Sequence, residues 1–299
     1  MRRTTLLLAV CFATGLSSGV TAAAPIFVRS FSADYLCNSR GIALSPSGEL
    51  FVSGDCEYGF MHMFTASGDY LGHWNYPNGF QSSVTGVAVD ASGNLFVADN
   101  FVSRVYKLTS SGVVLTSWPT PSGAIDVTVN SSGDVLVLEA GPKQIQKFTN
   151  DGVLLQTFGS AGLGTGQLQE PMGMGLDASG RLYVADRYRL RILRFRADGS
   201  FDMEFKTPHG MFDVAVGPDG LLYATRGDAY LEALIYSPEG TLLENFTTPN
   251  GLGLAWYIII TPTGTIYISE LGGRISMFQI DQTTSVARTT FGRLKAMYR

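Results

Sequence analysis

The sequence carries little charge and few histidines, and both shortages narrow the possible functions. Only 15% of its 299 residues are charged, whereas a disordered chain would have more charge and fewer apolar groups. The formal net charge of −4 gives no bulk attraction for nucleic acid, so we expect no nucleic-acid partner. A catalytic zinc commonly takes three protein ligands at one place, and the chain has three histidines in all.

Familiar catalytic motifs are also missing. The sequence contains no Gly-x-Ser-x-Gly segment and no recognisable Ser-His-Asp arrangement. Residues 159–166 are rich in glycine, but a phosphate-binding loop usually needs a lysine and a helix that follows it. Here the segment lacks lysine and a strand is expected next, so we interpret it as an ordinary loop.

One apolar run stands at the N-terminus, and it is too short to span a bilayer. Arg2 and Arg3 precede an apolar stretch at 6–13, and small residues follow up to 22–24. This order predicts a signal peptide at 1–24, with an uncleaved anchor as the alternative. No second run is long enough to cross a membrane, so we expect a secreted or periplasmic protein without a membrane span after cleavage.

Two of the three cysteines, Cys37 and Cys56, lie beyond the predicted signal peptide. Export would place them where disulfides persist. Both flank the first repeat described below, so we predict a Cys37–Cys56 disulfide. Two unpaired thiols are the alternative.

What the chain does contain is a repeat. A short apolar strand, a four-residue turn ending in glycine and a second apolar strand recur six times, with starts about 40–47 residues apart, the spacing of propeller blades. The six copies lie at 41–52, 86–97, 126–137, 173–184, 213–224 and 257–268.

Each repeat holds a second hairpin whose turn also ends in glycine, as at 148–152 and 195–199. Its last strand commonly ends in an aromatic residue, such as Trp74, Trp118 or Phe158. Each repeat therefore predicts four strands, a to d, in one antiparallel sheet. We predict an all-β, six-bladed β-propeller over residues 25–291.

A Pro-x-Gly segment precedes strand a in most repeats, for example at 121–123 and 171–173. These features resemble the NHL repeat family. The best match is the Gly-rich segment 159–173 together with the segments that follow it at 184–186 and 191–192. The resemblance covers about residues 26–291. It implies the propeller fold but not one activity, because propellers of this family host unrelated functions.

Both chain ends offer a strand that could complete the sixth blade. Residues 26–31 and residues 286–291 each look like a strand d, and we favour the N-terminal segment. A strand from each end of the chain would then meet in one blade and close the ring. The short basic tail at 292–299 is expected to be a frayed terminus.

The starts of strand a line the central channel of any propeller, and three of the six repeats carry glycine there. The other three carry Asp126, Asp213 and Tyr257. Arg40 precedes the first strand a, and His209 lies just before Asp213. We predict a polar ligand site at this channel mouth, with Asp126 and Asp213 as possible ligands of calcium or zinc. Side chains that merely solvate a water-filled channel are the alternative.

Strand b often ends in an acid with a basic or polar residue five positions later, as in Asp99 with Arg104 and Asp186 with Arg191. The resemblance to the NHL pattern includes this pair. The fixed spacing favours an ion pair that orders the b–c loop over a ligand-binding ring. Blade five carries Arg226 instead of the acid, and a broken rule in a repeat can mark a site, so Arg226 joins the predicted channel-mouth residues.

These observations favour a non-catalytic binding or scaffold module that presents its loops to a protein, peptide or glycan. We expect a monomer. The alternative is a secreted metal-assisted lyase or hydrolase, similar at fold level to the amidating lyases and gluconolactonase-type propellers. The histidine cluster of the former has no evident counterpart here.

Overall fold

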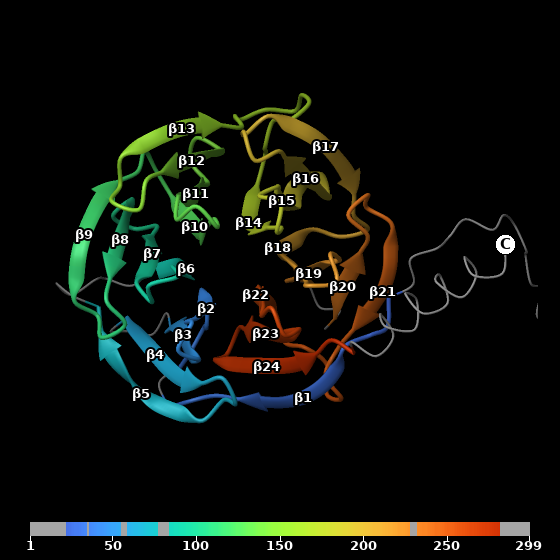
Figure 1. Ribbon diagram of the computed structural model, residues 1–299. Coiled ribbons are helices and arrows are strands. Elements are labelled where there is room, and N and C mark those ends of the chain that lie inside the picture. The colour runs from blue at the N-terminus through green and yellow to red at the C-terminus, as the bar shows by residue number, and fades with distance from the viewer. Residues whose placement is uncertain (1–21, 35, 55–58, 77–83, 228–231, 282–299) are drawn as a thin grey trace, which may run out of the picture.

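A computed structural model describes residues 22–34, 36–54, 59–76, 84–227 and 232–281 of the chain. Six four-stranded antiparallel sheets stand around a central axis like the blades of a propeller (Figure 1). The only helix in these ranges is one 3₁₀ turn, η1 (Arg187–Arg189). The predicted all-β, six-bladed architecture is therefore confirmed.

Blades one to three are contiguous in sequence, and strands a to d run from the axis outward in each. Blade one contains β2 (Ile42–Leu44), β3 (Glu49–Gly54), β4 (Phe60–Thr65) and β5 (Tyr70–Asn75). Blade two contains β6 (Val84–Val89), β7 (Leu95–Asp99), β8 (Arg104–Leu108) and β9 (Val114–Pro119). Blade three contains β10 (Ala124–Val129), β11 (Val135–Glu139), β12 (Gln144–Phe148) and β13 (Leu154–Phe158).

Blades four and five repeat this order, and blade six departs from it. Blade four contains β14 (Pro171–Leu176), β15 (Leu182–Asp186), β16 (Arg191–Phe195) and β17 (Phe201–Lys206). Blade five contains β18 (Met211–Val216), β19 (Leu222–Arg226), β20 (Ala233–Tyr236) and β21 (Leu242–Phe246). Blade six contains β22 (Ala255–Ile260), β23 (Thr265–Glu270), β24 (Arg274–Gln279) and the N-terminal β1 (Ile26–Phe31).

Local turn chemistry explains the hairpins. Between β6 and β7 the side chain of Asp90 accepts hydrogen bonds from the backbone N–H groups of Ser92 and Asn94, each at 2.9 Å. Gly93 then takes a φ of 84°, which glycine adopts without a steric cost. These turns let each four-strand blade form from neighbouring segments of the chain.

The core lies between the blades. Strand b is buried along its whole length in blades two to five, whereas strand d forms the outer rim and is largely exposed. The aromatic residues predicted at the end of strand d fill the space between sheets. Trp118 of blade two, for example, packs against Phe148 of blade three with ring centroids 5.6 Å apart, directly over Gly152.

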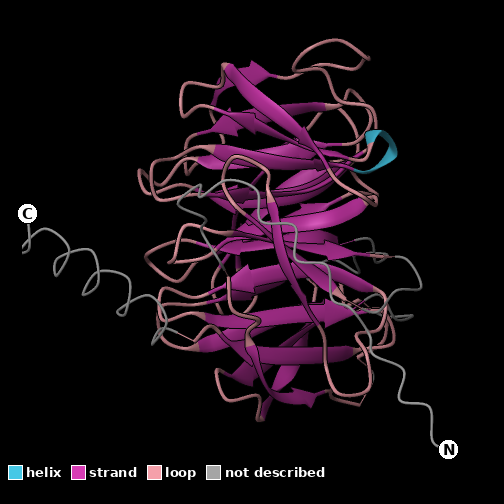
Figure 2. Cartoon of the chain, turned by 90° about the vertical axis from the view of Figure 1, so that its right-hand side faces the viewer, coloured by secondary structure: helices cyan, strands magenta, loops and turns pink. Residues whose placement is uncertain are grey.

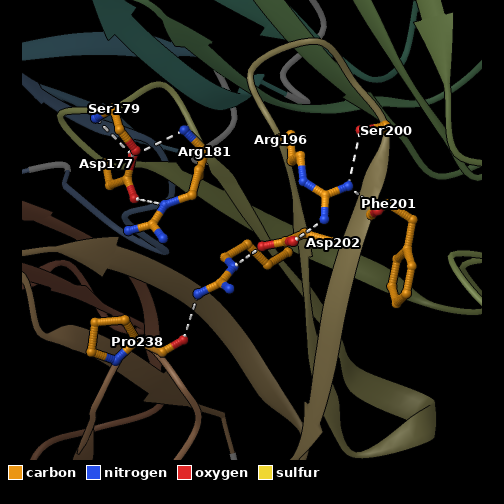
Figure 3. Close-up of polar contacts among 9 residues, drawn as sticks. Asp177, Ser179, Arg181, Arg196, Ser200, Phe201, Asp202 and Pro238 are labelled. Carbon is orange, nitrogen blue, oxygen red and sulfur yellow. Dashed lines mark hydrogen bonds and ion pairs between the residues drawn. The ribbon is translucent and has the colours of Figure 1, made fainter.

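Polar contacts add to this apolar packing at the rim between blades four and five (Figure 3). Asp202 on β17 accepts hydrogen bonds from both Arg194 and Arg196 on the same sheet. Arg194 also donates to the carbonyl oxygen of Pro238 in blade five, at 2.9 Å. The carboxylate thus holds a guanidinium in position to join two blades.

The N-terminal strand closes the ring, as the sequence favoured. β1 pairs antiparallel with β24, from Ile26 opposite Gln279 to Phe31 opposite Ile275. The ring of Phe31 is buried and lies 5.2 Å from that of Phe64 in blade one. The alternative closing segment, 286–291, lies outside the described residues.

The remaining predictions on the chain termini and cysteines fall partly outside the described residues. Residues 1–21, the tail 292–299 and Cys56 lie outside the described residues. Cys37 is disulfide-bonded, and its pairing with Cys56 stays a prediction. No helix in the described part of the chain is long and apolar enough to span a membrane.

We expect Phe31→Ala to lower the free energy of unfolding by about 3 kcal/mol, because it empties a buried space at the junction of blades six and one. In a protein of this size, the melting temperature should fall by roughly 6–12 °C in calorimetry. Phe101→Ala is the matched control, since the Phe101 side chain is 69% exposed. Equal melting temperatures for the two variants would contradict this role of β1.

Candidate functional site

A bulge near the start of strand a shapes the channel mouth. In blades two, three, five and six the a–b register shifts by one residue at this point. The extra residues are Thr85, Ile125, Phe212 and Trp256. Bulges bend a strand and redirect a side chain, and they are common beside functional sites. The bulge residues lie one position before the predicted channel residues. They are therefore closer to the face of the propeller that carries the d–a and b–c connections, which we call the loop face.

Four of the side chains on this face form a continuous row, which we call the mouth row: Arg187, Phe212, Trp256 and Arg40. The Arg187 guanidinium lies 4.7 Å from the centre of the Phe212 ring. The rings of Phe212 and Trp256 meet edge to face with centroids 4.9 Å apart. The Arg40 guanidinium lies 4.9 Å from the Trp256 ring. The row therefore joins blades four, five, six and one.

A pocket of about 410 Å³ opens beside one end of the mouth row. It lies between blades four and five, next to η1, which projects from one face of the disc (Figure 2). Its lining residues are Glu170, Arg187, Tyr188, Leu190, Gly210, Phe212 and Gly227. The side chain of Tyr188 is 68% exposed, and the Arg187 guanidinium lies 3.3 Å from the carboxylate of Glu170 in the same lining, so a carboxylate ligand would share or replace this ion pair.

Behind the mouth row, Asp126, Asp213 and Tyr257 project into the channel. We call these three residues the septum. The hydroxyl of Tyr257 in blade six donates a hydrogen bond to the carbonyl oxygen of Ile125 in blade three, at 2.7 Å. Since these blades face each other across a six-membered ring, the tyrosine spans the channel. The structure thus brings the three predicted residues together.

Each septum carboxylate joins its own blade to the next one. Asp126 accepts hydrogen bonds from the backbone N–H groups of Val127 and Met174, both at 2.8 Å. Asp213 accepts from the N–H groups of Val214, at 2.8 Å, and Ile258, at 3.0 Å. The acids therefore bridge blades three and four and blades five and six.

Glycine at the equivalent position of the preceding blade leaves room for each acid. A Cβ atom on Gly86 would lie 2.9 Å from Oδ1 of Asp126, and one on Gly173 would lie 2.3 Å from Oδ1 of Asp213. Glycine and acid therefore alternate along blades two to five because a second side chain would not fit.

Burial makes ionisation of the septum costly. Desolvation raises the pKa of Asp126 from 3.8 to about 7, against the opposing effect of its two backbone hydrogen bonds. The pKa of Asp213 is also raised well above its ordinary value, first by desolvation and then by the negative charge of Asp126. The pKa of Tyr257 is raised by burial and by both acids. The three groups therefore sense one another's charge.

The other predicted channel residues have separate surroundings. Arg40 lies at the mouth, half-buried against Trp256. His209 is half-buried in the loop before β18, where its carbonyl oxygen accepts a hydrogen bond from Thr207, and it lines neither the mouth pocket nor the channel cavity described below.

Arg226 belongs to an ion pair within blade five. Its buried guanidinium lies 2.7 Å from Glu232 at the start of strand c, so the prediction that it lines the channel mouth needs correcting. Blades four and six form the same pair with the opposite polarity, as in Asp186 with Arg191 at 2.9 Å. In blade five the acid and the base have exchanged places. The feature of the sequence that indicates this exchange is Glu232, an acid six positions after Arg226.

The pair predicted in blade two has different partners. Asp99 accepts hydrogen bonds from the backbone N–H groups of Phe101 and Val102 in the b–c loop. Arg104 donates to the carbonyl oxygen and the hydroxyl of Ser117. Here the acid orders the loop by itself, through backbone N–H groups.

A calcium or zinc ion fits the septum poorly. All four carboxylate oxygens of Asp126 and Asp213 already accept a backbone N–H group, and the raised pKa values oppose the doubly charged state that a cation would require. In the part of the chain that the structure describes, no three His, Cys, Asp or Glu residues are grouped so that they could hold a metal.

The raised pKa of Asp126 predicts a pH-dependent stability. Its folded-state pKa of about 7 exceeds the unfolded value, so its contribution is fully present below about pH 4 and is lost as the pH rises to 7. Relative to Asp126→Asn, the wild type should lose on the order of 2–4 kcal/mol of unfolding free energy over this range.

Chemical denaturation at a series of pH values measures this difference. The hydrogen bond that the asparagine loses adds an offset independent of pH. Glu139, whose pKa burial also raises to about 7, is present in both proteins and cancels. Parallel stability curves for the two proteins would contradict the burial of a titrating Asp126.

Comparison with known proteins supports the fold alone. No protein-family model and no curated protein matches the chain. Virginiamycin B lyase from Staphylococcus aureus has a similar structure, with a TM-score of 0.64 and 15% identity over 84% of this chain and 98% of that one. A structure described as a gluconolactonase-family protein has a TM-score of 0.65 and 16% identity over 87% and 97%. The WD40 propeller domain of Doa1 has a TM-score of 0.61 and 11% identity over 86% and 98%. Membership of the NHL family stays a prediction.

Proposed function

We propose that this protein is an exported, non-catalytic binding propeller whose loop face captures a peptide or glycan that carries carboxylate groups. The mouth row is the observation that supports this proposal. It places two aromatic rings between two guanidinium groups at the end of the channel, next to a pocket of about 410 Å³.

The chemistry of the row defines the ligand. Guanidinium groups bind carboxylates through paired, charge-assisted hydrogen bonds. Aromatic rings offer rigid apolar surface for the carbon face of a sugar or for an apolar side chain. A concave site with mixed apolar and polar walls of this size is typical of small-ligand recognition. An acidic oligosaccharide or a short acidic peptide matches each of these features.

The signal peptide predicted at 1–24 supports a ligand outside the cytoplasm, and a single ring presents one loop face, so we propose that a monomer binds it. The septum lies just behind the mouth row and joins four blades, three to six, by hydrogen bonds. A rigid base of this kind would hold Phe212 and Trp256 in place before a ligand arrives and so reduce the entropy lost on binding.

Trp256 provides both a probe and a test. Titration with an oligogalacturonate, and separately with a glutamate-rich hexapeptide, should change its fluorescence. Trp256→Ala should weaken binding at least tenfold, because hot-spot aromatic residues contribute most where they are held in place. Trp256→Phe should retain more of the affinity than the alanine variant.

Two controls make this test specific. The methyl esters of the same ligands lack the carboxylates and should bind more weakly if Arg40 and Arg187 recognise charge. Phe101→Ala removes an exposed aromatic residue from a b–c loop of the same face and should leave the affinity unchanged. If neither acid binds at millimolar concentration, or if Trp256→Ala binds as the wild type does, the proposal is wrong.

A lyase or hydrolase is the second candidate. Asp126, with a pKa of about 7, suits proton transfer near neutral pH, and its negative charge contributes to the raised pKa of Tyr257. Two structural neighbours are described as a virginiamycin B lyase and a gluconolactonase-family protein, and a lyase variant with alanine in place of a histidine is described as catalytically inactive.

Under this alternative, the wild type should open δ-gluconolactone or a related lactone faster than buffer does, and Asp126→Asn should slow the reaction by about 100-fold or more. A pH-stat assay, with and without EDTA, calcium or zinc, measures the rate. Identical rates for wild type, variant and buffer with all of these lactones would leave the binding proposal as the one to pursue.

A further inference from the structure

A second space lies on the other side of the septum from the mouth row. It is a cavity of about 480 Å³ that extends along strand a toward the a–b turns, as far as Pro46 and Pro262. Its floor is formed by Asp126, Asp213 and Tyr257. None of the four mouth-row residues lines it, so it is distinct from the site proposed above.

The walls of this cavity are largely apolar, although Ser45, Thr128 and Thr261 also line it. Blades one, two, three and six each contribute a branched aliphatic side chain at the same position of strand a, namely Leu44, Val89, Val129 and Ile260. All four are only partly buried. A ring of aliphatic side chains gives few hydrogen bonds to water, so an apolar ligand that displaced this water would gain free energy.

The floor has the opposite character. The two carboxylates are less than 6% exposed, and within the described residues neither forms an ion pair with a lysine or arginine. Each oxygen accepts one backbone N–H group, which leaves capacity for a further donor. The negative charge of Asp126 raises the pKa of Asp213, so the two acids resist being charged together. A singly charged cation needs only one of them to be ionised and would offset the cost of burying that charge.

We propose that this channel cavity binds a small organic ammonium ion, with its hydrocarbon part against the aliphatic walls and its charged head on the carboxylates of Asp126 and Asp213. Charge complementarity selects this class. A carboxylic acid would bring a further negative charge to the floor, and a neutral alcohol would leave the ionised acid without a counter-charge. The proposal does not depend on the function assigned to the loop face.

Primary alkylammonium ions of increasing length are suitable probes. Hexylammonium should bind with one-to-one stoichiometry in isothermal titration calorimetry at pH 8, above the pKa of about 7 of Asp126. Each methylene group added from butyl to hexyl should tighten the affinity roughly threefold to fourfold, as burial of a methylene predicts. Hexanol should bind at least tenfold more weakly, and hexanoate more weakly still.

Two kinds of variant locate the ligand. Val129→Phe fills the cavity with a larger side chain and should abolish binding of hexylammonium. Val113→Phe makes the same substitution at a c–d turn, where the side chain is 60% exposed, and should bind as the wild type does. Asp126→Asn removes the acid whose pKa of about 7 leaves it charged at pH 8, so it should weaken hexylammonium at least tenfold and leave hexanol within about twofold.

Equal affinities for hexylammonium and hexanol would overturn the proposal, because the septum charge would then play no part. Undiminished binding to Val129→Phe would also overturn it, because the ligand would lie elsewhere. If Asp126→Asn does not fold, as its melting curve would reveal, the two valine variants and the three head groups still decide the question.

Discussion

The pairing of β1 with β24 is the constraint on which the rest of the molecule depends. An open arc of blades would leave the outer edge of β24 unpaired and would let the blades fan apart. Once this edge is covered, six strands a are held around one axis at a fixed radius. Only then do Tyr257 and Ile125, from opposite blades, come within hydrogen-bond distance. The geometry of the septum is therefore a consequence of closure.

The channel behaves as two compartments because its repeats are unequal. Gly86 and Gly173 have no side chain, which leaves room for the acids of the next blade, and Tyr257 spans the rest of the channel. On one side, rings and guanidinium groups face the solvent at the mouth. On the other, aliphatic walls enclose an acidic floor. A single layer of three side chains separates two environments that would suit ligands of opposite charge.

The sequence allowed the fold and the septum to be predicted, because both follow from periodic features. Six copies of one hairpin pattern fix the number of blades, and a side chain where the other three repeats have glycine must project into the channel, as Asp126, Asp213 and Tyr257 do. The mouth row was missed because Phe212 and Trp256 sit on bulges, and a bulge depends on how two strands pair rather than on local pattern. Arg226 was misplaced because its partner, Glu232, lies one residue beyond the spacing of the other pairs.

Blade six combines three C-terminal strands with the N-terminal strand β1, and this arrangement sets the order in which the ring can assemble. Blades one to five are each built from a contiguous segment, so their hairpins can form as soon as the segment is available. Among the described residues, β1 is the first strand and its partner β24 is the last. The N-terminal strand must therefore remain unpaired while every other blade forms, and the contact that completes the ring is also the one with the longest sequence separation.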